Sequence, residues 1–229
     1  MIRLAVLISG RGSNMICLAN AIRTYGIRAE IAIVISNKDC TGIKLAQRCG
    51  LPTQIIKRED FFNQAHQELA ISDAINYHKA NYIFLAGYMA ILGDDFVGQF
   101  FGQLVNIHPS LLPALKGLNT HQRAIDGGIE THGVSIHLVT TALDDGPIIL
   151  QASLPMQADE TSDRLAARVL ELEHQIYPFV LFGLAEKFLF LSPEGARWRS
   201  PLSALAVTPA PMRDLLAPSI IWPAPATSA

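Results

Sequence analysis

Two polar side chains end an apolar run near the middle of the chain. The motif NIHPSLLP begins with Asn106, directly after Leu104 and Val105. Asn106 and His108 are two positions apart, so on an extended strand both side chains leave the same face. Pro109 favours an extended conformation at His108. Because an amide and a protonated imidazole both donate hydrogen bonds, the pair suits an oxygen that becomes negatively charged during a reaction.

A candidate carboxylate partner for this histidine lies in the motif LDDGPII, residues 143–149. Asp144 and Asp145 precede a Gly-Pro turn, and taken alone such residues are typical of a solvated loop. A carboxylate about 4 Å from an imidazole, at an effective dielectric constant of about 20, interacts with it by roughly 4 kcal/mol and favours the protonated ring. An acid from this motif beside His108 would form a pair that can move a proton.

A different chemistry is indicated near the N-terminus. LISGRGSN, residues 7–14, has the order strand, Gly-x-Gly turn and helix start, with Ser13 expected to cap the helix. Free N–H groups at a helix N-terminus, and the close approach that glycine allows, favour an anion such as phosphate. A dinucleotide fingerprint would have a third glycine at Met15 and an acid where Ser36 and Asn37 stand. We therefore predict a phosphate site, with a tight turn that binds nothing as the alternative.

No metal site is predicted. His132 and His137 are five positions apart, and on a strand this odd spacing directs them to opposite faces. The histidines on predicted helices have no acid or cysteine at ligand spacing and are expected on the surface or in the core: His66, His78 and His121. The three cysteines lack CxxC spacing, so neither a disulfide framework nor a zinc site is indicated.

These candidate residues need an open sheet that brings strand ends together. In the first half of the chain, short β-branched runs alternate with segments of helical period, which is typical of a parallel sheet with flanking helices. Ligands of such sheets bind outside the carboxyl ends of the strands, where Asn106 and His108 lie. The expected strands cover residues 2–8, 29–36, 53–56, 82–86 and 103–108, and the expected helices include 12–25 and 61–79.

After residue 116 the pattern changes. A helix at 119–127 is followed by two strand-like runs, 131–139 and 147–154. Their connection is too short for a crossover helix, so an antiparallel hairpin is predicted.

A long helix is expected to begin at about Thr161, a good N-cap residue. Pro178 should kink this helix or divide it in two. Glu173 lies on or beside the apolar stripe, where an unpaired carboxylate is costly. We expect it either at the solvent rim or against a cation such as a substrate amine.

Composition excludes several classes of protein. The net charge is −2 and the 18 Lys and Arg residues are scattered, so nucleic acid is not an expected partner. No apolar run is long enough to span a membrane, and a cytoplasmic protein is predicted. Because proline becomes frequent from about residue 192, we divide the chain into a domain at 1–191 and a Pro/Ala-rich tail at 192–229. The tail could dock through Trp198 or Trp222.

Together these motifs resemble the glycinamide ribonucleotide formyltransferases of purine synthesis. The succession of NIHPSLLP and LDxGPI is specific to formyltransferases that use 10-formyltetrahydrofolate. The resemblance implies a Rossmann-like, mostly parallel sheet with flanking helices, a C-terminal antiparallel hairpin and a long helix, in a monomer or homodimer. It extends from residue 2 to about 190 and rests on LISGRGSN, ISNK (35–38), LAGYMAIL (85–92), NIHPSLLP, THGVSIHLV, LDDGPIILQ and EHQIYP (173–178).

The same resemblance implies roles for individual residues. The expected reaction moves a formyl group from 10-formyltetrahydrofolate to the amine of glycinamide ribonucleotide, with no metal. The family usually has Arg where Ala90 stands and another Arg near Asn63 and Gln64. The implied catalytic residues are Asn106, His108 and Asp144; the ribonucleotide would contact Gly12, Ser13, Asn14 and Glu173; and the folate would contact Met89, Ala90, Ile91, Leu92 and Asn106.

Other functions stay open at this point. One is a different formyltransferase, or a hydrolase, that uses the same folate. The others are a dinucleotide-binding oxidoreductase and a folate-binding relative without catalytic activity.

Overall fold

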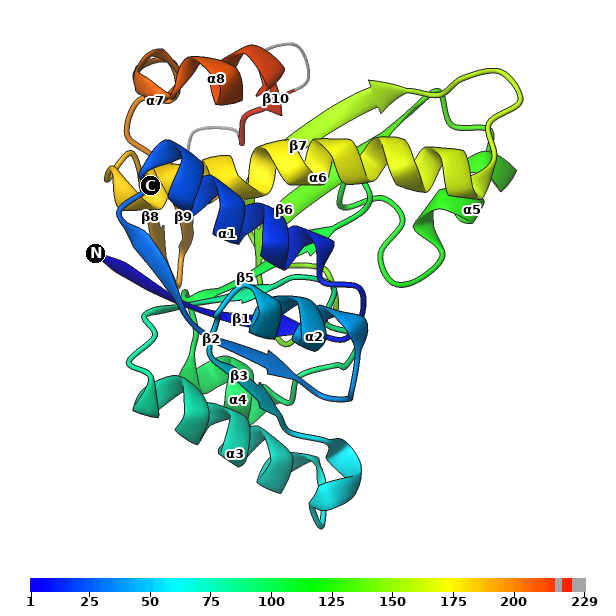
Figure 1. The fold of residues 1–229 in the computed structure, drawn as a ribbon. Coiled ribbons are helices and arrows are strands. Elements are labelled where there is room, and N and C mark those ends of the chain that lie inside the picture. The colour runs from blue at the N-terminus through cyan, green and yellow to red at the C-terminus, as the bar shows by residue number, and fades with distance from the viewer. Residues whose placement is uncertain (217–219, 224–229) are drawn as a thin grey trace.

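An eight-stranded sheet forms the centre of the molecule (Figure 1). It is seen in a computed structural model that describes residues 1–216 and 220–223. The strand order is β10-β7-β6-β5-β4-β1-β2-β3. Five strands are parallel: β1 (Ile2–Ile8), β2 (Ala29–Ser36), β3 (Thr53–Ile55), β4 (Tyr82–Leu85) and β5 (Leu104–His108). Three antiparallel strands follow: β6 (Thr131–Leu138), β7 (Ile148–Pro155) and β10 (Ile220–Ile221). The predicted mostly parallel sheet and the hairpin are confirmed.

Both faces of the sheet are buried, which explains why its strands are almost uniformly apolar. In β1, Leu4, Val6 and Ile8 belong to one core. Ala5 and Leu7 belong to the other. The first core lies under α1 (Ser13–Tyr25), α2 (Thr41–Arg48) and α6 (Ser162–Ala185), and the second under α3 (Gln64–Tyr77) and α4 (Asp94–Gln99) (Figure 1). A 3-10 turn, η1 (Arg58–Asp60), and α5 (Thr120–Asp126) complete the helices of this part.

Helix ends follow local capping. The helix α3 starts at Gln64 because the side chain of Asn63 accepts a hydrogen bond from the backbone N–H of His66, at 3.0 Å. At α1 the N-cap is Gly12, which makes no side-chain cap, and Ser13 is already the first helical residue. The expected capping role of Ser13 is therefore wrong, and the first N–H groups of α1 have no side-chain cap.

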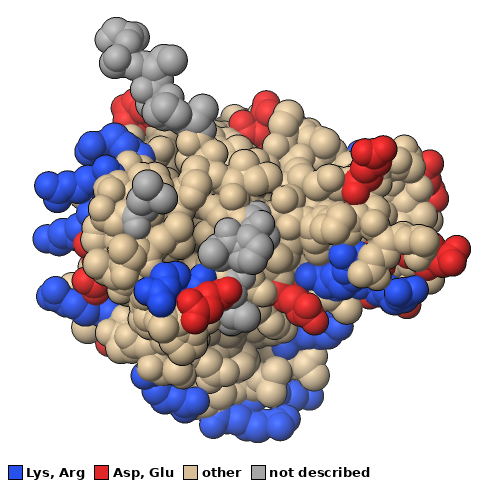
Figure 2. Space-filling view, turned by 90° about the horizontal axis from the view of Figure 1, so that it is seen from above, with Lys and Arg blue, Asp and Glu red and all other residues tan. Residues whose placement is uncertain are grey.

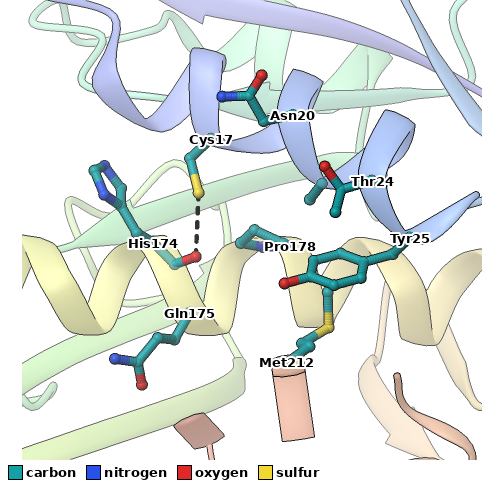
Figure 3. A pocket seen from close by; sticks show the side chains of 9 residues that line it. Cys17, Asn20, Thr24, Tyr25, His174, Gln175, Pro178 and Met212 are labelled. Atoms are coloured by element: carbon teal, nitrogen blue, oxygen red, sulfur yellow. Dashed lines mark hydrogen bonds between the residues drawn. The ribbon is translucent and has the colours of Figure 1, made fainter. Parts of the chain in front are cut away.

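The long helix α6 begins where expected, since Thr161 accepts a hydrogen bond from the N–H of Arg164 at 3.3 Å. It then continues unbroken past Pro178, so Pro178 does not divide the helix in two, and a kink there stays a prediction. Pro178 has no N–H for the carbonyl of His174. That carbonyl instead accepts from the thiol of Cys17 on α1, at 3.1 Å (Figure 3). A neighbouring helix thus supplies the missing donor.

The segment after α6 folds back onto the body of the molecule. It contains β8 (Leu189–Ser192), β9 (Gly195–Trp198), α7 (Pro201–Val207) and α8 (Ala210–Leu216), and β10 adds to the edge of β7. The ring of Trp198 stacks on that of Phe179, with 5.4 Å between the ring centroids, and its Nε1 donates to the carbonyl of Ile149 at 2.9 Å. The ring of Trp222 packs edge-on against that of Trp198, with 5.0 Å between the ring centroids. Docking through these two tryptophans is confirmed, whereas the division between residues 191 and 192 stays a prediction.

Charged side chains are distributed thinly over the surface. On the face shown in Figure 2, Lys and Arg are spread around the rim, interspersed with Asp and Glu, and wide areas between them are uncharged. Among the helices of residues 1–216 and 220–223, none has the length and apolar character needed to span a membrane.

Candidate active site

The strand pair β5 and β6 brings the first two candidate residues together. In this antiparallel register Asn106 lies opposite His137, and His108 lies opposite Ser135. Asp144 comes from the loop that follows β6, and its Oδ2 lies 3.4 Å from Nδ1 of His108. Both side chains are buried, with 7% and 9% of their surface exposed. The structure therefore places a carboxylate beside the imidazole, as the motif spacing suggested.

A further histidine joins this group. Nε2 of His137 lies 3.1 Å from the amide nitrogen of Asn106 and 3.7 Å from Oδ1 of Asp144. Its Nδ1 lies 2.8 Å from the carbonyl oxygen of Leu138, which requires an N–H there. Burial lowers the pKa of His137, which favours the neutral ring. Nε2 then accepts one N–H of the Asn106 amide and leaves the other N–H for a different acceptor.

An acceptor oxygen lies beside each ring nitrogen of His108. Besides Asp144 at Nδ1, the carbonyl oxygen of Leu115 lies 3.0 Å from Nε2. Both partners are acceptors, and only an imidazolium carries N–H donors on both nitrogens. The carboxylate of Asp144 is held in turn by the backbone N–H of Gly117, at 2.8 Å. Asp144 has a left-handed backbone with φ of 47°, a conformation that Asp tolerates better than most residues.

Buried polar contacts fix the turn that follows His108. The hydroxyl of Ser135 accepts from the N–H of Leu112 at 2.9 Å and donates to the carbonyl of Ser110 at 2.6 Å. Gln151 on β7 donates to the carbonyl of Leu112 at 3.0 Å and to the Ser135 hydroxyl at 2.7 Å. Nothing in the sequence pattern of β6 or β7 singled out Ser135 or Gln151, because their role depends on strand register.

The glycine-rich turn lies at the carboxyl end of β1. Gly12 has φ of 77°, and a Cβ there would lie 2.8 Å from the Cα of Gly42. Glycine is therefore needed both for its backbone conformation and for its close contact with the start of α2. The turn leads directly into the N-terminus of α1, whose first N–H groups can bind an anion.

Glu173 is partly buried and lies against this turn. Asn14 donates to its Oε2 at 2.6 Å. Burial raises the pKa of Glu173 to about 7, with the Asn14 hydrogen bond and the Arg11 charge acting in the opposite direction. The amide oxygen of Asn14 is buried and makes no hydrogen bond with the residues that the structure describes. A carboxyl group that changes its charge near neutral pH is well suited to meet a substrate amine.

A cleft of about 330 Å³ joins several of the predicted binding residues. Its lining includes Gly12, Ser13, Asn14, Met89, Pro109 and Glu173. Asn106, His108 and Asp144 do not line this space, although Pro109 directly follows His108. The cleft therefore extends from the glycine-rich turn to the edge of the histidine and carboxylate cluster.

Of the five residues predicted to contact folate, the four at 89–92 divide into two groups. Met89, Ala90 and Ile91 are exposed, and only Met89 lines the cleft, whereas Leu92 is buried in the core. The segment is held at both ends: the N–H of Met89 donates to the hydroxyl of Ser9 at 2.8 Å, and the carbonyl of Ile91 accepts from Gln64 at 2.9 Å. Gln64 thus holds the backbone of this loop from the start of α3.

Glu173 should make the stability of the unliganded protein depend on pH. A carboxyl group whose pKa is raised by folding to about 7 contributes stability below its unfolded pKa, and this stability is lost as the pH rises to about 7. As the pH rises from about 5 to about 8, the free energy of unfolding of the wild type should therefore fall, relative to that of Glu173→Gln, by on the order of 2 to 3 kcal/mol. Urea unfolding at both pH values measures this difference. Glu171→Gln, a matched change at an exposed position of α6, should follow the wild type. A parallel pH dependence of the wild type and Glu173→Gln would contradict this prediction.

A mostly parallel sheet carries a histidine and carboxylate pair at a strand end, next to a glycine-rich turn, which is the arrangement that the sequence motifs predicted for a formyltransferase. The model of the formyl transferase family matches residues 2–181, and the chain belongs to this family. A phosphoribosylglycinamide formyltransferase from Escherichia coli is 40% identical over 196 residues, covering 85% of this chain and 92% of that protein. Its counterpart from Haemophilus influenzae is 42% identical over 81% of this chain and 88% of its own length.

Solved structures agree with the sequence relatives. The phosphoribosylglycinamide formyltransferase of Coxiella burnetii superimposes with a TM-score of 0.82 at 42% identity, covering 86% of this chain and 93% of that one. The family expected from the sequence motifs is thereby confirmed, together with the fold.

Proposed function

We propose that this enzyme transfers the formyl group of 10-formyltetrahydrofolate to the amine of glycinamide ribonucleotide, giving formylglycinamide ribonucleotide and tetrahydrofolate. The observation that carries the proposal is the buried pair of His108 and Asp144, 3.4 Å apart, in a chain whose relatives are phosphoribosylglycinamide formyltransferases. A cytoplasmic location and a monomeric or homodimeric state belong to the same proposal.

The residues of the site can divide the chemical work as follows. Attack of the amine on the formyl carbon creates a tetrahedral intermediate with a negatively charged oxygen. Asn106 and protonated His108 donate hydrogen bonds to that oxygen, each donor contributing about 10² to 10³ in rate. Asp144 keeps the imidazole charged and oriented, and helps to move the proton of the amine to the leaving folate nitrogen.

Substrate contacts follow from the cleft. The phosphate would lie at the N-terminus of α1, against Gly12, Ser13 and Asn14, and the glycinamide end would meet Glu173. The pterin would lie beside the segment 89–92, where the exposed backbone can form hydrogen bonds whatever the side chain of Ala90. The loop at 140–145 would then close over the pterin.

A formyl transfer assay tests the proposal. With 10-formyldideazafolate as the donor, the deformylated product should appear only when glycinamide ribonucleotide is added. Product release without the acceptor would indicate a hydrolase, and donor binding without turnover would indicate a noncatalytic relative. Tight binding of NADH or NADPH, followed by fluorescence, would support an oxidoreductase instead.

The glycine-rich turn gives a second test. Gly12→Ala should raise the KM for glycinamide ribonucleotide by about ten-fold or more, because the new Cβ forces the turn away from Gly42 and disturbs the phosphate site. Gly26→Ala is a matched control: Gly26 ends the same helix with φ of 62°, and a Cβ there meets no atom within 4 Å. It carries a similar backbone strain, so its KM should stay at the wild-type value. An unchanged KM in Gly12→Ala would mean that the phosphate binds elsewhere.

A further inference from the structure

The segment 114–119, which precedes α5, contacts both members of the catalytic pair through its backbone. The carbonyl of Leu115 accepts from Nε2 of His108 at 3.0 Å, and the N–H of Gly117 donates to Asp144 at 2.8 Å. Since Nδ1 of His108 faces Asp144, Nε2 is the only ring nitrogen that can donate to a substrate. The carbonyl oxygen of Leu115 therefore takes the hydrogen bond of Nε2, which the formyl oxygen needs in the proposed reaction.

The backbone of this loop is held in an unfavourable conformation. Leu115 has a left-handed φ of 56°, which costs free energy in a residue with a bulky side chain, whereas Asn119, with φ of 57°, tolerates this conformation. Contacts from outside offset this cost. Arg123 donates to the carbonyl of Lys116 at 2.6 Å and to that of Leu118 at 3.2 Å. Displacement of the loop would break these contacts and relieve the strain, so a modest ligand interaction can move it.

One side-chain contact ties the loop to the segment that carries Asp144. The ammonium group of Lys116 forms an ion pair with Asp145, which directly follows the catalytic carboxylate in the chain. The two side chains are 35% and 54% exposed, so the pair is open to solvent and sensitive to salt. It joins the 114–119 loop to the loop between β6 and β7.

We propose that the ion pair of Lys116 and Asp145 holds the 114–119 loop with the Leu115 carbonyl on His108, so that the formyl donor binds only after displacing it. Lys116 and Asp145 are then positioning residues that raise the KM for formyl folate without taking part in the chemistry. The inference rests on the proposed function, because it assigns the Nε2 donor to the formyl oxygen. The apparent affinity of a ligand falls with the fraction of protein that is competent to bind it, so weakening the ion pair should strengthen binding.

Steady-state kinetics with varied formyl donor tests this role. Lys116→Met and Asp145→Asn should each lower the KM for the donor by about two- to five-fold, the range expected for an exposed ion pair, with kcat within about two-fold of the wild type. The double variant Lys116→Asp with Asp145→Lys restores the pair in reverse and should restore the KM. Raising the salt concentration should lower the wild-type KM relative to that of the neutral variants.

A matched control uses an ion pair at the amino ends of β1 and β2. Glu30→Gln breaks the ion pair between Arg3 and Glu30, whose side chains are similarly exposed at 37% and 41%. This change should leave the KM for the donor unaltered. A fall in kcat with unchanged KM in Lys116→Met would overturn the proposal, since it would mean that the ion pair supports Asp144 and does not occlude His108.

Hydrogen exchange gives a readout that does not depend on turnover. Amides of residues 115–119 should exchange faster in Lys116→Met than in the wild type or Glu30→Gln. Equal exchange rates in all three proteins would overturn the proposal that the ion pair of Lys116 and Asp145 holds the 114–119 loop. An absence of formyl transfer by the wild type would instead overturn the proposed function, while the exchange comparison would still test the ion pair.

Discussion

Replacing His108 with alanine is expected to lower kcat by about 10² or more while the KM values for both substrates change little. The imidazole is buried at the end of β5, and its Nδ1 lies 3.4 Å from the carboxylate of Asp144. It is placed to donate to an oxygen that becomes anionic only in the transition state, so its removal should act on kcat rather than on ground-state binding. Formyl transfer measured with each substrate varied in turn would separate the two effects.

A control for His108→Ala removes an imidazole that lies away from the site. His78→Ala removes an imidazole from the far end of α3 and should retain wild-type kinetics. Equal far-UV circular dichroism of His108→Ala and the wild type would show that the fold persists. Turnover of His108→Ala within about ten-fold of the wild type would remove this residue from the catalytic group.

Much of the architecture is encoded locally and could be predicted from the sequence. The bounds of β1 and β2 agree with the runs of apolar residues, because both faces of these strands are buried. The polar end of β5 was informative for the same reason: Asn106 and His108 interrupt a buried strand where a parallel sheet binds its ligands.

The parts that could not be predicted depend on contacts between distant segments. His137 appeared as one of several unremarkable histidines because its contact with Asn106 follows from the register of β5 and β6. Likewise, where α6 passes Pro178, the donor for the free carbonyl of His174 is Cys17, which is far away in the sequence. The secondary structure after residue 192 could not be predicted from composition, because it depends on the packing of Trp198 and Trp222 and not on the number of prolines.

Asp144→Asn is the second change for which we expect a large effect, a fall in kcat of about 10² or more with substrate binding largely retained. The exchange removes the charge and little else. Asn keeps an oxygen that can accept from the N–H of Gly117, which the carboxylate now does at 2.8 Å. Asn also tolerates the left-handed backbone of this position, where φ is 47°. The loop should therefore keep its course while His108 loses the anion that favours its protonated form.

A variant of the adjacent Asp145 distinguishes the loss of the Asp144 contact with His108 from a change in net charge. Asp145→Asn removes the same charge one residue further along the chain, from a side chain paired with Lys116 and not with His108. We expect its kcat to stay within about two-fold of the wild type. Similar losses of kcat in the two variants would mean that net charge, and not the pairing of Asp144 with His108, governs the reaction.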